Sequence, residues 1–261
     1  MKLGLTSTTR RIAAHDASAI AVLSRRVTNV PSEPEDVAAA PVKKERNAAE
    51  TQRRILDAAR AEFAAKGFDG ARLGTIARAA NVQQALIHHY FVDKEGLHRD
   101  VMDEGLTAMT RGVIELLPLM NAPAKKPKKK AKKRSVAELR ALAEAFVDVL
   151  HRFFVTNGDF IAILRHEAGR NADSVTKIVG KHVTPVFEGI VAGLEQMRTR
   201  GEIKKNVDAK HLILSAMAMV AFPFQDEPFV AGIWPADWRA PHLLAERKEH
   251  VVEMILARIA P

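Results

Sequence analysis

The apolar positions of residues 48 to 106 recur with the period of an α-helix and fall into four stripes. These stripes are Ile55, Ala59 and Phe63; Leu73, Ile76, Ala77 and Ala80; Ile87, Tyr90 and Phe91; and Leu97, Val101 and Leu106. Gly67 ends the first predicted helix, and Asn81, which tolerates a left-handed turn, separates the second from the third. Asp93 can cap the fourth helix, which we expect to reach about residue 118. The first three form a helix-turn-helix unit.

Helical patterns also fill the chain after residue 134. Ser135 and Glu138 have the spacing of a capping box and begin a helix that Asn157 and Gly158 end. The further predicted helices cover residues 160–167, 173–200, 212–222 and 241–259. The segment 212–222 is apolar on nearly every side, which predicts that it is buried all round. The pattern contains no convincing strand, so the chain is predicted to be all-α with about nine helices.

These elements divide the chain into three predicted parts. Residues 1–46 lack sustained periodicity and form a disordered N-terminal extension. Residues 47–97 form a three-helix, homeodomain-like helix-turn-helix domain whose fourth helix continues to about residue 118. Residues 98–261 form a C-terminal helical bundle, interrupted by a basic disordered loop at 121–135.

The beginning of the chain is basic, but its apolar run Ala19–Leu23 is too short for a secretory signal. It is similar to an organelle transit peptide, although a disordered leader or an upstream start codon is the favoured interpretation. No apolar run approaches the ~20 residues that span a bilayer. We therefore expect a cytoplasmic protein without a membrane partner.

Composition and charge narrow the function further. The absence of cysteine excludes disulfides, zinc fingers and thiol catalysis. The formal net charge is +9, but the run Lys125–Arg134 holds eight basic residues and no acid, so the rest of the chain carries +1. The high net charge is therefore no evidence for a nucleic-acid-coating protein. The run follows a predicted helix about 38 Å long and should emerge far from the helix-turn-helix unit. A solvated loop is favoured over a segment that contacts DNA non-specifically, RNA or an acidic partner.

The third helix is predicted to have two unlike faces. Ile87, Tyr90 and Phe91 hold it against the first two helices, and the opposite face presents small and polar residues. A recognition helix needs this division in order to enter the major groove. Gln84 can bond an adenine edge, and Leu86 can touch a thymine methyl group. The candidate DNA-binding residues are Arg72, Thr75, Gln83, Gln84, Ala85, Leu86, His88, His89, Tyr90 and Lys94.

The same segment resembles the N-terminal module of the TetR/AcrR family of bacterial transcriptional regulators. The resemblance rests on Thr51–Ala59, Phe63, Gly67–Phe68, Ile76–Ala77, Asn81–Val82, Ile87–Phe91 and Lys94–Leu97. It implies a homodimeric repressor that binds a palindromic double-stranded DNA operator and is released by an unidentified small-molecule effector. The sequence departs from the family pattern at three points: Ala71–Arg72 replace a hydroxyl cap, Gln83 is a weak cap, and Asn81 stands where glycine is common.

Two further sets of residues are candidates in the C-terminal bundle. The candidate effector pocket comprises Phe146, Leu150, Phe153, His166, Phe187 and Met217, and the candidate dimer interface comprises Leu214, Met217, Val251 and Ile255. A small-molecule pocket could also be lined by Met217, Met219, Phe222 and Phe224, but at helical spacing a plain core is the favoured interpretation.

No metal site, cofactor or enzymatic activity is predicted. Adjacent residues on a helix diverge by about 100°, so His88 and His89 cannot chelate one ion. His166-Glu167 is not a zinc motif because Arg170 stands where a second histidine is needed. Two other functions stay open: a small-molecule or lipid carrier with a vestigial DNA module, and an architectural protein that binds DNA through the lysine run.

Overall fold

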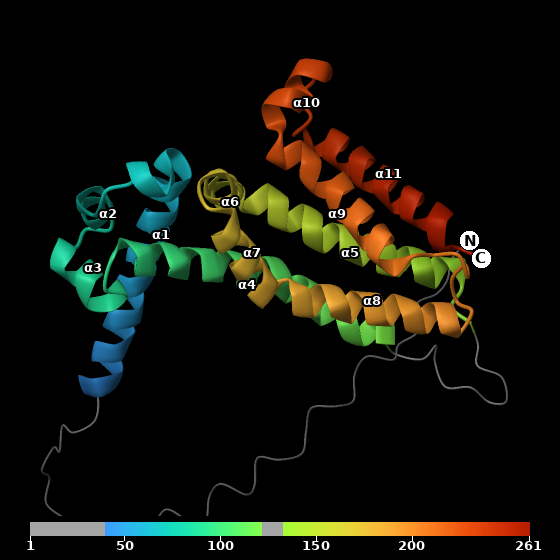
Figure 1. The fold of residues 1–261 in the computed structure, drawn as a ribbon, viewed down its shortest axis with the longest axis horizontal. Helices are drawn as coiled ribbons and strands as arrows, with labels where there is room; N and C mark the ends of the chain where they lie inside the picture. The colour runs from blue at the N-terminus through green and yellow to red at the C-terminus, as the bar shows by residue number, and fades with distance from the viewer. Residues whose placement is uncertain (1–39, 122–132) are drawn as a thin grey trace, which may run out of the picture. The chain divides into compact units, whose positions relative to one another are not determined.

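The computed structural model describes residues 40–121 and 133–261, and these residues form eleven helices without a strand. In chain order they are α1 (Ala40–Gly70), α2 (Leu73–Ala79), α3 (Gln84–Phe91), α4 (Lys94–Asn121), α5 (Val136–Thr156), α6 (Gly158–Arg170), α7 (Ala172–His182), α8 (Thr184–Thr199), α9 (Ala209–Gln225), α10 (Glu227–Ile233) and α11 (Pro241–Ile259). Helix α4 leads from the module of α1–α3 into the bundle of the later helices (Figure 1). None of the described helices is long and apolar enough to cross a membrane.

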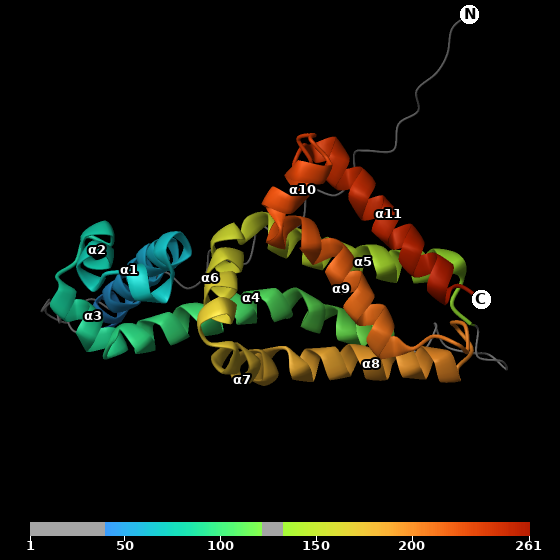
Figure 2. The same cartoon turned by 45° about the horizontal axis from the view of Figure 1, so that its top comes forward.

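The all-α prediction is confirmed, whereas the predicted count of about nine helices is too low by two. The expected helix over 173–200 is divided into α7 and α8, because Pro185 in the first turn of α8 has no N–H to continue a preceding helix. Helix α10 was not expected, and it too has a proline in its first turn. It lies between α9 and α11 at the turn of the chain (Figure 2).

The module of α1–α3 closes around a fully buried apolar centre. Ile55 and Phe63 of α1, Ile76 of α2 and Ile87 of α3 have no exposed surface, which confirms the predicted anchor face of the third helix. Gly67 has a φ of 65°, a value that side-chain-bearing residues rarely adopt, and α1 kinks there. The sequence signal that ends the first helix at this glycine therefore marks a real change of direction.

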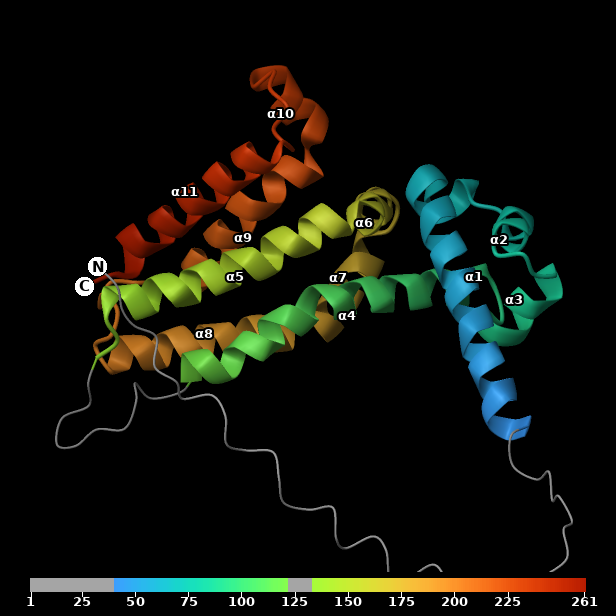
Figure 3. The same ribbon diagram turned by 180° about the vertical axis from the view of Figure 1, so that it is seen from behind.

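The bundle is organised around α5, which packs against α4, α9 and α11. The predicted capping box is present: the Glu138 N–H donates to the Ser135 hydroxyl at 3.2 Å, and the Ser135 N–H donates to the Glu138 carboxylate at 2.7 Å. Helix α4 also approaches α6 closely at Gly105. A Cβ atom at this position would lie only 2.1 Å from the Phe160 ring of α6. Only glycine fits this contact, which fixes how α4 lies in the bundle (Figure 3).

The predicted basic loop falls largely on residues 122–132, which lie outside the described part of the chain. Arg134, the last residue of the run, is not solvated as predicted. Its guanidinium donates to the Glu202 carboxylate at 3.0 Å and to the Leu119 carbonyl at 2.7 Å. A cation is favourable beside the last carbonyls of a helix, and here it holds the chain at the C-terminal end of α4.

Glu202 is the acceptor on which this end of the bundle depends. Its side chain is 2% exposed and also bonds Arg200 at 2.8 Å. Because breaking a buried ion pair leaves its partners uncompensated, Glu202→Gln should lower the free energy of unfolding by about 3 kcal/mol. Urea denaturation followed by circular dichroism measures this loss. Glu195→Gln, which breaks the exposed pair with Arg198, is the matched control and should cost under about 1 kcal/mol. Equal losses in the two variants would contradict the role given to Glu202.

Candidate DNA interface and ligand cavity

The turn between α2 and α3 is built from backbone hydrogen bonds. Asn81 adopts the left-handed conformation expected of it, with a φ of 53°, and the Val82 N–H donates to the Ala77 carbonyl at 2.9 Å. Arg72 precedes α2 at the N-cap position, and its side chain makes no capping hydrogen bond. Its backbone N–H donates to the Glu62 carboxylate of α1 at 3.3 Å. This contact was missed by sequence reasoning, because no local spacing connects residues ten positions apart.

Helix α3 presents the predicted polar face to solvent. Its buried side holds Ile87 and Phe91, and Tyr90 is half-buried beside them. The exposed residues are Gln84, Ala85, Leu86, His88 and His89, with Gln83 preceding them as an N-cap that makes no side-chain hydrogen bond. Six of the ten candidate DNA-binding residues therefore lie together at one exposed surface, which we call the α3 face.

The remaining candidates flank this helix. Arg72 is exposed at the start of α2, and Thr75 is half-buried one turn later. Lys94 begins α4, but its ammonium lies 4.7 Å from the centre of the Phe68 ring and 3.5 Å from the Asp69 carbonyl. The Asp93 carboxylate accepts the Gly96 N–H at 2.7 Å, so the predicted cap of α4 is confirmed and this N–H is already paired.

A cluster of charged and aromatic side chains joins the module to the bundle where α1, α4 and α6 meet. The cations of Lys94 and Arg170 both lie over the Phe68 ring, and the Arg170 guanidinium carbon is 4.3 Å from the ring centre. Arg170 bonds the buried Glu167 carboxylate at 2.9 and 3.0 Å. Burial lowers the pKa of His98 below its ordinary value, although Glu167 opposes this, so the imidazole is neutral at pH 7. We refer to these residues as the Phe68 cluster.

A cavity of about 290 Å³ lies in the bundle, lined from α4 to α9. Four of the six candidate effector residues line it: Phe146, Leu150, Phe187 and Met217. The other two do not. Phe153 is buried against Phe160, with 6.0 Å between ring centres, and His166 is an exposed residue beside Gly67. We call this the large cavity.

Sequence reasoning missed two polar residues of the large cavity, Thr110 and Gln225. The sequence signal that could have identified them is a polar side chain on an otherwise apolar helix stripe. Thr110 is buried and donates to the Leu106 carbonyl at 3.0 Å, whereas Gln225 is exposed at the last position of α9.

The candidate dimer residues divide between the surface and the interior. Leu214 is 56% exposed on α9, but Val251 and Ile255 are only 1% and 6% exposed, because their stripe of α11 faces the chain's own core. These two residues are therefore unavailable for a contact between protomers, and Met217 faces the large cavity. The prediction that 212–222 is buried all round is also wrong for the single chain. The large hydrophobic residue that α11 exposes is Met254, at 50% exposure.

The α3 face, set on a three-helix module by a tight turn, defines a helix-turn-helix DNA-binding protein. Comparison with known proteins agrees with this class. Residues 55–101 match the family model of bacterial regulatory proteins of the tetR family, and residues 136–255 match the tetracyclin repressor-like C-terminal domain. Together these matches cover more than half of the chain. The chain belongs to the TetR family and is a DNA-binding transcriptional regulator.

Individual relatives are distant. The HTH-type transcriptional regulator UidR of Escherichia coli is 23% identical over 161 residues, which are 60% of this chain and 71% of UidR. A TetR transcriptional regulator from Chloroflexus aurantiacus shares the fold with a TM-score of 0.55 and 21% identity, over 82% of this chain and 98% of that one. The fatty acid degradation regulator FadR from Bacillus halodurans shares the fold with a TM-score of 0.57 and 16% identity, over 79% of this chain and 94% of that one.

Proposed function

We propose that the protein is a homodimeric repressor that binds a palindromic DNA operator through the α3 face and leaves it when a small molecule enters the large cavity. The proposed division is a DNA-binding domain at 47–97 and an effector-binding and dimerisation domain at 98–261. The observation that carries the proposal is that one helix, α4, begins at the module and lines the large cavity with Leu106, Thr110 and Val113.

Sequence-specific binding is supported by the chemistry of the α3 face. Gln84 supplies the paired donor and acceptor that recognise adenine, and Leu86 supplies an apolar contact for a thymine methyl group. His88 and His89, with Arg72 and Thr75 of α2, are proposed to contact the phosphate backbone, which positions the protein but does not read sequence. The edge of the proposed DNA interface comprises Gln83, Ala85, Tyr90 and Lys94.

A dimer is supported by the apolar surface that α9 and α11 expose. Leu214 and Phe222 of α9 and Met254 of α11 are uncovered in the single chain. Exposed apolar residues on neighbouring helices are typical of a contact between protomers. A two-fold contact of this kind presents two α3 faces to two half-sites, which is why we propose a palindromic operator.

The experiment that tests the proposed function is a fluorescence anisotropy titration of the full chain against DNA from upstream of its own gene. Specific binding should exceed binding to a scrambled duplex by about a thousandfold at physiological salt. Equal affinity for both duplexes would overturn the proposal and favour the carrier or the architectural protein. Repression is then tested with a reporter gene placed behind the same DNA.

Gln84→Ala should weaken operator binding by about 1–3 kcal/mol, because it removes a bidentate contact to one base. Binding to scrambled DNA should change little, since phosphate contacts remain. Anisotropy titrations of both duplexes measure the difference. Gln196→Ala on α8 serves as the matched control and should leave both affinities unchanged. A loss that is the same on both duplexes would show that Gln84 does not read a base.

Met254→Arg should convert the dimer to a monomer at micromolar concentration, because it places a charge within an apolar contact. Leu214→Arg, on the neighbouring helix α9 of the same chain, should have the same effect. Sedimentation velocity measures the mass of each variant, and circular dichroism checks that its helices persist. Val155→Arg, at an exposed apolar position of α5, is the control that should remain dimeric. Dimeric Met254→Arg and Leu214→Arg would contradict the proposed interface.

A further inference from the structure

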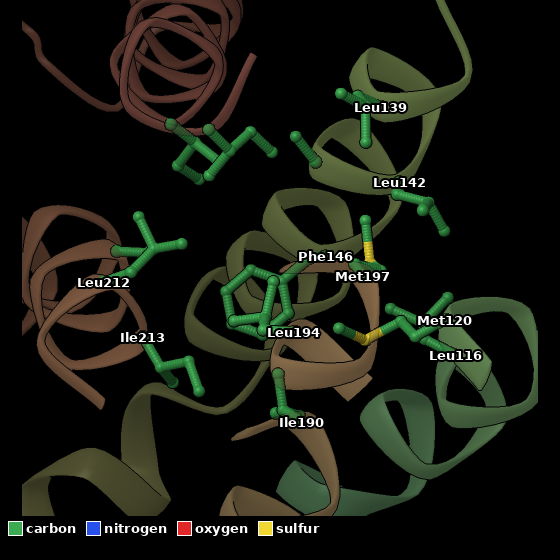
Figure 4. A pocket seen from close by; sticks show the side chains of 14 residues that line it. Leu116, Met120, Leu139, Leu142, Phe146, Ile190, Leu194, Met197, Leu212 and Ile213 are labelled. Carbon is green, nitrogen blue, oxygen red and sulfur yellow. The ribbon is translucent and has the colours of Figure 1, made fainter. Parts of the chain in front are cut away.

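The large cavity is accompanied by a second, smaller cavity of about 70 Å³, whose lining includes Leu116 and Met120 near the C-terminal end of α4. The small cavity is lined by apolar residues of α4, α5, α8, α9 and α11. Two residues, Phe146 of α5 and Ile190 of α8, line both cavities and so form a shared wall. Figure 4 shows the Phe146 ring in the middle of the side chains that surround the small cavity.

The chemistry of the two linings selects against a charged ligand. Among the described residues that line either cavity, none has an ionisable side chain, and only Thr110 and Gln225 are polar. The Thr110 hydroxyl already donates to a backbone carbonyl, whereas Gln225 ends α9 at the surface. An ion taken into such a cavity would lose its hydration without gaining a partner, which is strongly unfavourable.

The volumes indicate the size of the ligand. A dry apolar cavity of about 150 Å³ is large enough to bind benzene, which corresponds to roughly 25 Å³ for each carbon. On that scale the large cavity accommodates on the order of ten carbons, and the small cavity adds about three.

We propose that the effector is an elongated, uncharged apolar molecule whose single polar group stays near Gln225, and that Phe146 sets its length by separating the two cavities. This inference rests on the proposed function, since it names the ligand class of the site through which the operator is released. The apolar end of the ligand lies against Phe146, and a longer molecule is excluded because the ring closes the way into the small cavity.

The test uses straight-chain alcohols of six to sixteen carbons, which displace an apolar fluorescent dye from the full-length protein. Affinity should rise with chain length and reach its maximum near ten carbons. Phe146→Ala should move this maximum by at least three carbons toward longer chains, because the two cavities then join. Phe146→Leu should give a smaller shift in the same direction and serves if the alanine variant does not fold.

Phe153→Ala is the matched control, because Phe153 lies on the same helix but lines neither cavity. It should leave the preferred chain length unchanged. Decanoate at pH 7 should bind at least tenfold more weakly than decanol, since its carboxylate finds no cation in the lining. An unchanged preferred length in both Phe146 variants, or tighter binding of decanoate than of decanol, would overturn the inference.

Operator binding is measured separately, so the two failures can be told apart. Specific operator binding without any alcohol binding would leave the proposed function standing and overturn the ligand class. Alcohol binding with the predicted length preference, but without specific operator binding, would support the assignment of the cavities. That result would overturn the proposed function and identify a carrier.

Discussion

The contact of the Phe68 ring with two cations ties the module to the bundle. Lys94 of α4 and Arg170 of α6 lie over the same ring. The Phe63 ring stacks with it, and the His98 ring meets it edge to face. A cation over an aromatic face is worth about 0.5–2 kcal/mol, more when it is withdrawn from water. The buried Glu167 carboxylate pairs with the Arg170 guanidinium at 2.9 Å.

Helix α4 contributes side chains to both the core of the module and the core of the bundle. Leu97 and Val101 are fully buried close to the module, and Leu106, about 14 Å along the axis from Leu97, lines the large cavity. Gly105 lets α6 press directly on the helix at this point. Under the proposed function, a ligand that favours another position of α4 acts on the α3 face through this one helix. It can do so only to the extent that it binds the two arrangements with different affinity.

The sequence predicted best those features that local patterns determine. The stripes of α1–α3, the turn at Asn81 and the capping box at Ser135 are local, and the structure confirms them. The split at Pro185 carried a local signal too, but the apolar period continues across it and concealed the break. The burial of Val251 could not be predicted in this way, because an apolar stripe does not say whether it faces its own chain or a partner.

The contacts between distant segments were beyond the reach of sequence reasoning. Glu202 and Arg134 are 68 positions apart, and only the folded chain brings them to the end of α4. The Phe68 cluster likewise combines three helices. The candidate effector residues were found in part, since Phe146 and Phe187 lie on predicted helix faces that meet at the large cavity. Phe153 belongs to the same helix as Phe146 but faces a different neighbour, and the helical period alone could not separate the two.

The central claim is that occupancy of the large cavity and of the α3 face are coupled through α4. The most direct measurement is the affinity of the protein for decanol, determined once for the free protein and once for the protein saturated with its operator. Coupling is reciprocal, so decanol should bind the operator complex more weakly by the same factor by which it weakens operator binding. The account predicts a factor of about five or more. Equal decanol affinity of the free and the operator-bound protein would contradict it.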